Sequence, residues 1–519
     1  MAHITKTDSG EKDMKTVVTN PVLRMDYPDP EVIRVGDSFY MTTTSTHFMP
    51  GVPIMKSKDL KNWEVISYLY DTFSDCEAHK LENGKSIYGA GAWATSMRYH
   101  KGKYYVCFNC NDRKQTYIYC TENIEDGVWQ RSVIKGMHHD PSLLFDTDGR
   151  VYLVYGNGTI WIQELEENCS DIRQDGIHQI LIDTPQVEGL NCEGSHFQYI
   201  DGKYYLFLIQ WPKGRRRIQW CYRSDTLLGA YEGRILLDDC MEYGNEGVAQ
   251  GGVFDTPAGE WYAMLFQDRG AVGRCPVLVR VTWKDGWPEL GRKGKVEKQL
   301  EVDLEENLHI SKKGESKSLH IPQQMDSMWE WNHNPDKDAF SVAERKGWLR
   351  LKNKNPASEL ERARNILTLR TIEPWCCGEV LLDTEGMKEN ELAGCAAFQN
   401  TYGYIGIRIG NSGARTIVQG ICEDHRKDGT AIVREESLEE IKGKKVYLRI
   451  IFDFRERRDR AWFEYSEDNE IWKAGKRYLQ MNYQLEHFAG YRFALFSFGE
   501  ENQEGYADFQ FLAMEQKEK

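Results

Sequence analysis

One phrase recurs five times in the first 300 residues, and this repeat limits the possible folds more than any other feature of the sequence. Each copy is an alternating apolar run, a turn that contains glycine, and a second run rich in aromatic residues. Such a phrase is typical of a β-hairpin, because tight hairpin turns need residues that adopt positive φ. The turn glycines of the five copies are Gly36, Gly102, Gly149, Gly202 and Gly259.

The spacing of these hairpins predicts a β-propeller. Successive turn glycines are separated by as few as 47 residues (Gly102 to Gly149) and as many as 66 (Gly36 to Gly102). Repeats of this length are typical of propeller blades with about four strands each. We therefore predict an all-β chain whose residues 21–300 form a five-bladed β-propeller. A β-sandwich with coincidental hairpins is the alternative for this region.

The rest of the chain divides into three further segments. Residues 1–20 are interpreted as an N-terminal leader or extension, and the polar residues 301–320 as a linker. Residues 321–519 keep alternating apolar and polar runs without the repeated phrase, which predicts a C-terminal β-sandwich.

Charge and composition exclude several classes of protein. The formal net charge is −14, which disfavours nucleic-acid binding, and no run of about 18 apolar residues is present to span a membrane. Thirteen scattered cysteines are an odd number, and the first residues lack the apolar segment of a signal peptide. We therefore expect a cytoplasmic protein with reduced thiols and no nucleic-acid or membrane partner. A homo-oligomer remains open.

The candidate site residues occupy one position of the repeat. Nine residues before the turn glycine in blades two to five, and seven before it in blade one, the chain carries three carboxylates, an indole and an amide. The first strands of all blades line the central channel, so these side chains are expected to converge. They are Asp29, Trp93, Asp140, Glu193 and Gln250.

Three carboxylates beside an aromatic ring suit glycoside hydrolysis. One carboxylic acid can protonate the leaving oxygen, a second can act as base or nucleophile, and a third can raise the pKa of the acid. The face of Trp93 can pack against a sugar ring. A structural ion-pair network is the alternative interpretation of the same carboxylates.

Several phrases of the sequence resemble those of a known family. The phrases are NPVLRMDYPDPEVIRVGDSFYMTTTS, GAGAWATSMRYHKGKYYV, HDPSLLFDTDGRVYLVYG, EGSHFQYIDGKYYLF, FQDRGAVGR and, in the second domain, WEWNHNPDKDAFSV and AAFQNTYGYIGI. They resemble glycoside hydrolase family 43, in its two-domain β-xylosidase/α-L-arabinofuranosidase branch. The resemblance implies Asp29 as general base, Glu193 as general acid, Asp140 as the residue that tunes and orients the acid, and Arg274 as a contact to sugar hydroxyls.

Departures from the family pattern carry expectations of their own. Relatives often have an aromatic residue where this chain has Thr46, so His47 or Phe48 is a candidate for that wall. Relatives also often have His-Gln where this chain has Ala249-Gln250, so we predict no cofactor and no metal ligand, and a calcium ion is in doubt. As in relatives, the second domain is expected to close the site, with an aromatic residue of the segment 490–511.

The predicted function is exo-acting, inverting hydrolysis that releases β-D-xylose, α-L-arabinofuranose or both from the non-reducing ends of xylo- or arabino-oligosaccharides. Trp93, Gln250 and Arg274 are the expected substrate contacts. His138 and His139 are interpreted as hydrogen-bonding or sugar-contacting residues rather than metal ligands. Two alternatives remain: a non-catalytic carbohydrate-binding propeller, and a retaining five-bladed fructan or sucrose hydrolase, whose two carboxyls would lie closer together.

Overall fold

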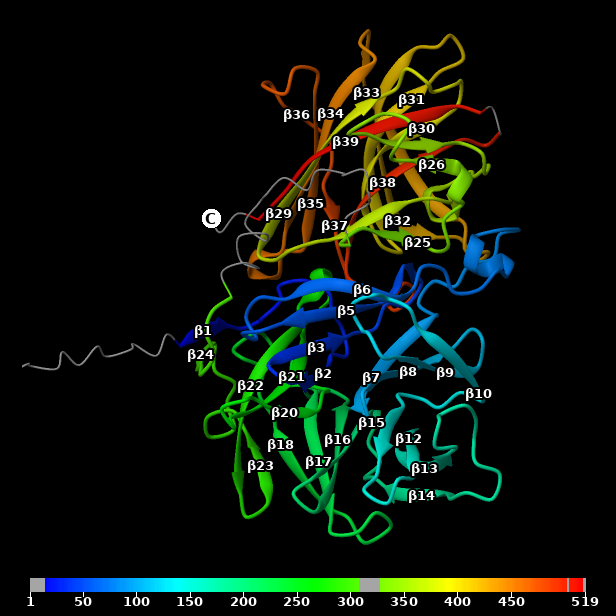
Figure 1. The fold of residues 1–519 in the computed structure, drawn as a ribbon. Helices are drawn as coiled ribbons and strands as arrows, with labels where there is room; N and C mark the ends of the chain where they lie inside the picture. The colour runs from blue at the N-terminus through cyan, green and yellow to red at the C-terminus, as the bar shows by residue number, and fades with distance from the viewer. Residues whose placement is uncertain (1–14, 308–326, 502–503, 517–519) are drawn as a thin grey trace, which may run out of the picture.

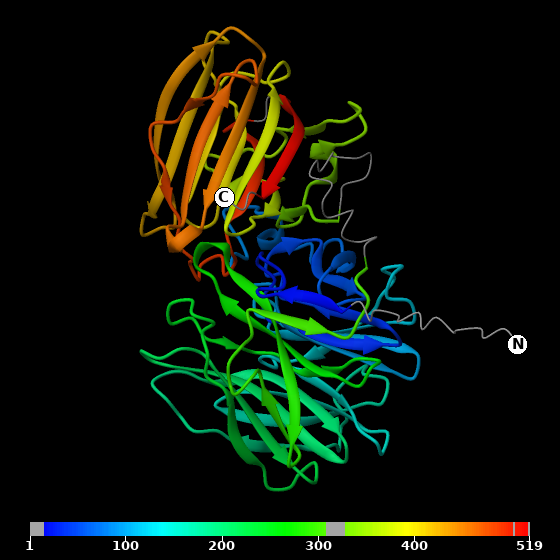
Figure 2. The same ribbon diagram turned by 90° about the vertical axis from the view of Figure 1, so that its left-hand side faces the viewer.

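Two all-β domains make up the protein. The computed structural model describes residues 15–307, 327–501 and 504–516. In Figure 1 the strands coloured blue to green form one domain, and those coloured yellow-green to red form the other domain above it. Figure 2 shows the same two domains turned by 90° about the vertical axis. No helix among the described residues is both long and apolar enough to cross a membrane.

The first domain is a five-bladed β-propeller, as the sequence predicts, and each of the first three blades is an antiparallel sheet of four strands in chain order. Blade one contains β2 (Glu31–Val35), β3 (Ser38–Thr42), β5 (Gly51–Ser57) and β6 (Glu64–Tyr70). Blade two contains β7 (Ala92–His100), β8 (Lys103–Cys110), β9 (Gln115–Thr121) and β10 (Gln130–Lys135). Blade three contains β11 (Ser142–Phe145), β12 (Val151–Asn157), β13 (Thr159–Leu165) and β14 (His178–Asp183).

Blades four and five complete the ring. Blade four contains β15 (Gly189–Ile200), β16 (Lys203–Pro212), β17 (Ile218–Ser224) and β18 (Glu232–Leu237). In blade five the inner position is divided between two short strands that both pair with β21. Its strands are β19 (Val248–Ala249), β20 (Val253–Asp255), β21 (Trp261–Asp268), β22 (Arg274–Lys284) and β23 (Trp287–Leu290).

The hairpin turns are those that the sequence predicts. All five turn glycines have positive φ, from 63° at Gly36 to 88° at Gly149. A Cβ atom at any of them would meet nothing within 4 Å, so backbone conformation, not lack of space, requires glycine there.

Apolar packing between neighbouring blades holds the ring together. The second strands β3 and β8 are almost entirely buried, whereas the fourth strands β10 and β18 are largely exposed. One buried cluster joins Val32 and Met41 of blade one to Phe254 and Tyr262 of blade five, so it closes the ring. Both faces of these second strands are therefore covered, which explains their largely apolar runs.

A strand pair outside the blades links the start of the propeller to its end. β1 (Thr16–Thr19) pairs with β24 (Gln299–Val302), and the Asn20 amide donates hydrogen bonds to the carbonyl oxygens of Leu278 and Glu297, both 2.8 Å away. The predicted leader 1–20 thus contains a strand, and the predicted linker 301–320 begins inside β24. The partners are about 280 residues apart, so no local pattern reveals the pairing. Most of the predicted linker lies outside the described residues.

The second domain is the predicted β-sandwich. One sheet has the order β33-β32-β31-β30-β38-β28-β25-β4, and the other has the order β26-β27-β39-β29-β34-β35-β36, with β37 beside β35. The strands of the first sheet are β4 (Phe48–Met49), β25 (Glu330–Asn332), β28 (Leu367–Arg370), β30 (Leu392–Phe398), β31 (Tyr402–Ile409), β32 (Arg415–His425), β33 (Ala431–Ile441) and β38 (Arg492–Phe498). Those of the second are β26 (Phe340–Ser341), β27 (Leu349–Lys352), β29 (Trp375–Asp383), β34 (Lys445–Asp453), β35 (Arg460–Ser466), β36 (Lys473–Ala474), β37 (Leu479–Gln480) and β39 (Tyr506–Gln516).

The two domains share a sheet. β4 leaves blade one between β3 and β5 and pairs with β25, so the propeller supplies the edge strand of the first sandwich sheet. Short 3₁₀ helices occupy connections in both domains: η1 (Glu77–Lys80), η2 (Gly270–Val272), η3 (Lys337–Ala339), η4 (Leu360–Arg362) and η5 (Arg455–Arg457). The shared sheet brings loops of the second domain to the propeller.

Candidate active site

The backbone departs from a regular strand at each of the five repeat positions. Asp29, Asp140 and Gln250 adopt positive φ values of 53°, 46° and 63°. Trp93 and Glu193 lie within continuous strands, and in both places the pairing register shifts at the residue or beside it. Positive φ at residues other than glycine and bulges inside strands cost free energy and occur often at functional sites. At each of the five repeat positions, an irregular backbone conformation therefore sets the direction of the candidate side chain.

The predicted site residues lie in one chain of contacts. The Arg274 Nη1 group donates to Asp29 Oδ1 at 2.8 Å, and the Arg274 guanidinium lies 4.5 Å from the ring centroid of Phe488. The Phe488 ring lies 5.2 Å from the ring of Trp93, whose other neighbour is His139 at 6.0 Å.

The chain of contacts ends on the other two carboxyls. His139 Nε2 donates to Glu193 Oε2 at 2.8 Å and lies 3.6 Å from Asp140 Oδ2. Residues from all five blades and from the second domain therefore surround one point. Gln250 joins them through Gly194, since a Cβ atom on that glycine would lie only 2.9 Å from the Gln250 Cδ atom.

Asp29 is a buried, fully partnered carboxylate. It is 5% exposed. One oxygen accepts from Arg274, and the other accepts from the Thr44 hydroxyl at 2.6 Å. These contacts fix the direction of both oxygens.

Asp140 is the carboxyl that lacks a cation of its own. Burial raises its pKa to about 7, helped by the negative charges of Glu193 and Asp29 and opposed by His139. The Gly194 backbone N–H donates to its Oδ2 atom at 3.1 Å. A proton is therefore shared within this cluster near neutral pH, as groups that interact this strongly titrate together.

Glu193 is held by two donors on the same oxygen. His139 Nε2 and the Asn157 side-chain amide both donate to Oε2. Burial lowers the proton affinity of His139, but Asp140, Glu193 and Asp29 outweigh it and raise its pKa to about 9. His139 is therefore a cation at neutral pH, and Oε1 is the oxygen that these two donors leave to other partners.

Arg274 presents unused donors. It is 4% exposed, and its Nε and Nη2 atoms have no hydrogen-bond partner among the described residues. Buried guanidinium donors without partners are costly, so a ligand with hydroxyl groups would satisfy them.

Comparison with known proteins agrees with this geometry. Residues 18–288 match the family described as glycosyl hydrolases family 43, and residues 322–515 match the β-xylosidase C-terminal concanavalin A-like domain.

The chain belongs to glycosyl hydrolase family 43.

Relatives of this family 43 hydrolase cover most of its length. A β-xylosidase of Formosa agariphila is 26% identical over 94% of this chain and 88% of its own. A non-reducing end α-L-arabinofuranosidase of Bacteroides ovatus is 28% identical over 64% of each chain. A solved structure described as a bifunctional GH43-CE of Bacteroides eggerthii is 39% identical with a TM-score of 0.89; the match covers 97% of this chain and spans 64% of that one.

The second domain of the family 43 hydrolase reaches the site through one residue that the sequence analysis missed. No residue of the segment 490–511 could be assigned from the sequence; in the structure Phe488, two residues before that segment, contacts Trp93 and Arg274. Asp26 fixes this loop, because its two carboxylate oxygens accept from the backbone N–H groups of Arg274 and Gly490, both at 2.8 Å. In the sequence, the aromatic pair His487-Phe488 lies just before Gly490, so extending the candidate segment by three residues would have included Phe488.

His47 and Phe48 do not replace the missing aromatic residue at Thr46. The His47 ring packs against Phe48, Tyr88 and His333 at the domain junction, and the Phe48 ring lies 4.1 Å from the guanidinium of Arg492. The shared strand β4 carries Phe48 into the first sandwich sheet, where it lies opposite Asn332.

Ala249 stands where relatives have histidine and is fully buried against Ile209 and Phe266. Among the described residues, only one group of His, Cys, Asp and Glu brings three possible ligand atoms within 4.8 Å of one another: His139, Asp140 and Glu193. Within this group, His139 Nε2 and Glu193 Oε2 form an ion pair with each other at 2.8 Å. We therefore interpret this group as a proton-sharing cluster, and the absence of a metal stays a prediction.

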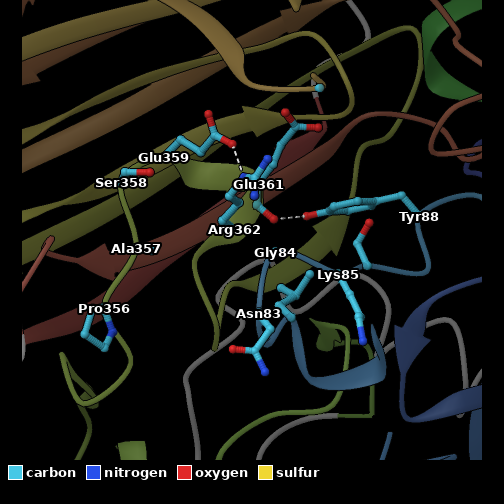
Figure 3. Close-up of a pocket in the computed structure, with 13 residues that line it drawn as sticks. Asn83, Gly84, Lys85, Tyr88, Pro356, Ala357, Ser358, Glu359, Glu361 and Arg362 are labelled. Atoms are coloured by element: carbon cyan, nitrogen blue, oxygen red, sulfur yellow. Dashed lines mark hydrogen bonds and ion pairs between the residues drawn. The ribbon is translucent and has the colours of Figure 1, made fainter. Parts of the chain in front are cut away.

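A separate cavity lies at the domain junction (Figure 3). It has a volume of about 250 Å³ and lies between the segments 81–88 and 356–362. The Tyr88 hydroxyl donates to the Glu361 carbonyl oxygen across it, 2.7 Å away. None of the predicted site residues lines this cavity.

Proposed function

We propose that this family 43 hydrolase removes single pentose units, β-D-xylose, α-L-arabinofuranose or both, from the non-reducing ends of short oligosaccharides, with inversion. The observation that carries the proposal is the unbroken chain of contacts from Asp29 through Arg274, Phe488, Trp93 and His139 to Glu193. The names of the β-xylosidase and α-L-arabinofuranosidase relatives support the choice of sugars.

The proposed reaction divides the work between two carboxyls. Asp29, oriented by its contacts with Arg274 and Thr44, takes a proton from water as the water oxygen attacks the anomeric carbon. Glu193 gives a proton to the glycosidic oxygen as the bond between that oxygen and the anomeric carbon breaks. Attack and departure on opposite faces invert the anomeric configuration.

The surrounding residues have supporting roles in this proposal. Asp140, whose pKa burial raises to about 7, places a second carboxyl beside the acid, and its negative charge once ionised opposes a second negative charge next to it. His139 and Asn157 stabilise the carboxylate that forms on Glu193.

The proposed substrate contacts are the side-chain groups of the site that lack a protein partner or offer an apolar face. The unpartnered Nε and Nη2 atoms of Arg274 would bind sugar hydroxyls. The Trp93 indole N–H already donates to the Gly89 carbonyl at 2.9 Å, so the ring acts as an apolar platform. Phe488 closes one side, which favours a chain end over a chain interior. We propose a cytoplasmic location, where such an enzyme would act on imported oligosaccharides.

Hydrolysis of nitrophenyl β-D-xyloside and nitrophenyl α-L-arabinofuranoside, with the first-formed anomer followed by NMR, tests the proposal. We expect release of at least one sugar with inverted configuration, and the ratio of kcat/KM values names the preferred sugar. Release with retention would contradict the roles of Asp29 and Glu193. No release of either sugar would favour a binding role.

A matched pair of variants tests the two roles. We expect Glu193→Gln to lower kcat on unactivated oligosaccharides by about 10²–10⁴-fold, with a much smaller loss on a dinitrophenyl glycoside, because a good leaving group needs no proton. Asp29→Asn should lower kcat on both kinds of substrate. Equal losses for both variants on both substrates would contradict the assignment of Glu193 as the acid.

A further inference from the structure

The strand β15, which carries Glu193, and its partner β16 extend beyond the proposed site as a paired ladder of two strands. In the β15–β16 pair, Glu193 lies opposite Ile209, and the same two strands continue through the pairs Leu190–Trp211 and Gly189–Pro212. Leu190 is three residues from Glu193, which corresponds to about 10 Å at the rise of an extended strand. The end of this ladder is therefore close to the proposed acid without belonging to the chain of contacts around it.

A hollow lies against the end of this ladder. Its volume is about 450 Å³, and it is lined by both strand ends, by the turn 212–215, and by Asn245 and Glu246 of the connection between blades four and five. This volume is within the range of small-molecule sites. None of the predicted site residues lines it.

Trp211 is an exposed but immobilised ring in this hollow. It is 38% exposed. Its indole N–H donates to the Arg215 carbonyl oxygen at 2.8 Å, and the Arg217 guanidinium lies 4.3 Å from the ring centroid. A flat ring whose polar atom is already bonded and whose orientation is fixed is suited to pack against the apolar face of a sugar.

The same packing connects the hollow to the proposed site. The Arg217 guanidinium lies 5.4 Å from the Phe266 ring, and the Arg274 guanidinium lies 5.4 Å from that same ring. Trp211 is thus anchored to the wall of the site through two intervening side chains, Arg217 and Phe266.

The charges around the hollow are matched, which decides the chemistry of its ligand. Arg215 pairs with Asp238 at 3.0 Å, Arg217 with Asp268 at 2.6 Å, and Glu246 with Arg457 at 2.9 Å. Lys213 pairs with Glu188. Since each cation and the one carboxylate of this rim already has a partner, the hollow favours a neutral sugar over a phosphate or an acidic sugar.

We infer that the Trp211 hollow is a subsite for neutral sugar residues on the leaving-group side of the oligosaccharide. The inference rests on the proposed function, because the acid Glu193 must face the leaving oxygen and so directs the departing chain over blade four. A chain of two or three leaving sugars spans the distance to Trp211, and a single nitrophenyl ring does not. The subsite would therefore select for oligosaccharide length.

The test compares substrates with long and short leaving groups. For the sugar that the wild-type enzyme releases, kcat/KM is measured on the nitrophenyl glycoside and on the matching tri- and tetrasaccharides. We expect Trp211→Ala to lower the ratio of tetrasaccharide to nitrophenyl kcat/KM by about tenfold, through a higher KM. Tyr199→Ala is the matched control, because Tyr199 is 37% exposed at the opposite end of β15 and should leave both values unchanged.

Two further measurements keep the inference falsifiable. Trp211→Leu keeps the apolar volume but removes the flat ring, so it should show the same selective loss even if Trp211→Ala does not fold. In the Glu193→Gln background, Trp211→Ala should weaken trisaccharide binding about tenfold by calorimetry. Equal losses on long and short substrates, or no loss on either, would overturn the subsite. A wild-type enzyme inactive on all substrates would instead overturn the proposed function.

Discussion

Two buried clusters of charge lie close together in this protein, and they differ in balance. At the domain junction, Glu330 accepts from Arg370 and Arg492, both at 2.8 Å. The Asp26 backbone carbonyl oxygen accepts from Arg370, and the negative charge of the Asp26 side chain acts on both arginines, which makes a set of two acids and two arginines. Glu330 is fully buried. Every formal charge in this set has an opposite, and the set joins the propeller to the sandwich.

The site cluster has one acid too many. Asp29, Asp140 and Glu193 face only two cations, Arg274 and His139. Burial raises the pKa of Asp140, and the negative charges of Glu193 and Asp29 add to this effect. A buried carboxyl with a strongly raised pKa, beside other acids, is typical of a functional site.

Breaking the balance at the junction should give the largest effect. We expect Glu330→Gln to lower the apparent free energy of unfolding by about 3–5 kcal/mol, because two buried arginines lose their counter-charge. Urea denaturation followed by fluorescence measures it. As a control, Glu232→Gln removes an exposed pair with Arg234 and should cost less than about 1 kcal/mol. A junction variant as stable as this control would contradict the comparison.

Removing the charge of Asp140 should lower activity without lowering the free energy of unfolding. We expect Asp140→Asn to lower kcat/KM by about 10²–10³-fold while the free energy of unfolding stays equal or rises, because a buried carboxyl without its own cation is removed. Kinetics and urea denaturation on the same preparation test both parts. A clear loss of stability would place Asp140 with the junction type of cluster.

The site cluster should make stability depend on pH above neutrality through His139. The pKa of His139 is raised from 6.5 to about 9 in the folded protein, so its contribution is complete below about pH 6.5 and is lost as pH rises through 9. The stability difference between wild type and His139→Gln should therefore shrink by roughly 3 kcal/mol from pH 6 to pH 10.

His138→Gln is the matched control for this pH dependence. The ring of His138 bonds Thr116 and Gln163, and no site carboxyl, so this variant should show no comparable trend above neutrality. A constant difference between wild type and His139→Gln across the same range would mean that His139 is not a cation at neutral pH.

Two phenylalanines over arginines give the smallest and sharpest test. Phe488 lies over Arg274 in the site, and Phe48 lies over Arg492 at the junction. We expect Phe488→Ala to lower kcat/KM about tenfold with little change in Tm, because a wall of the site is lost. Phe48→Ala should lower Tm strongly, because Phe48 is only 2% exposed. The reverse pattern would remove Phe488 from the site.

Much of the fold was predictable because its repeat is local. Each hairpin carries its own alternation and its own turn glycine, so five copies could be recognised without any distant contact. The pair β1–β24 and the shared strand β4 were not predicted, because both depend on partners about 280 residues away. The excess charge of the site could be anticipated only as a count of acids, not as one particular raised pKa.

The sequence by itself determined the blades, the sandwich and the register at which Asp29, Asp140, Glu193, Trp93 and Gln250 converge, because periodicity and turn chemistry are written in neighbouring residues. Only the tertiary structure decided that Phe488 closes the site, that His139 and Asn157 share one oxygen of Glu193, and that Asp140 lacks its own cation. These depend on distances between residues from different blades and domains, and burial sets the strength of their charges.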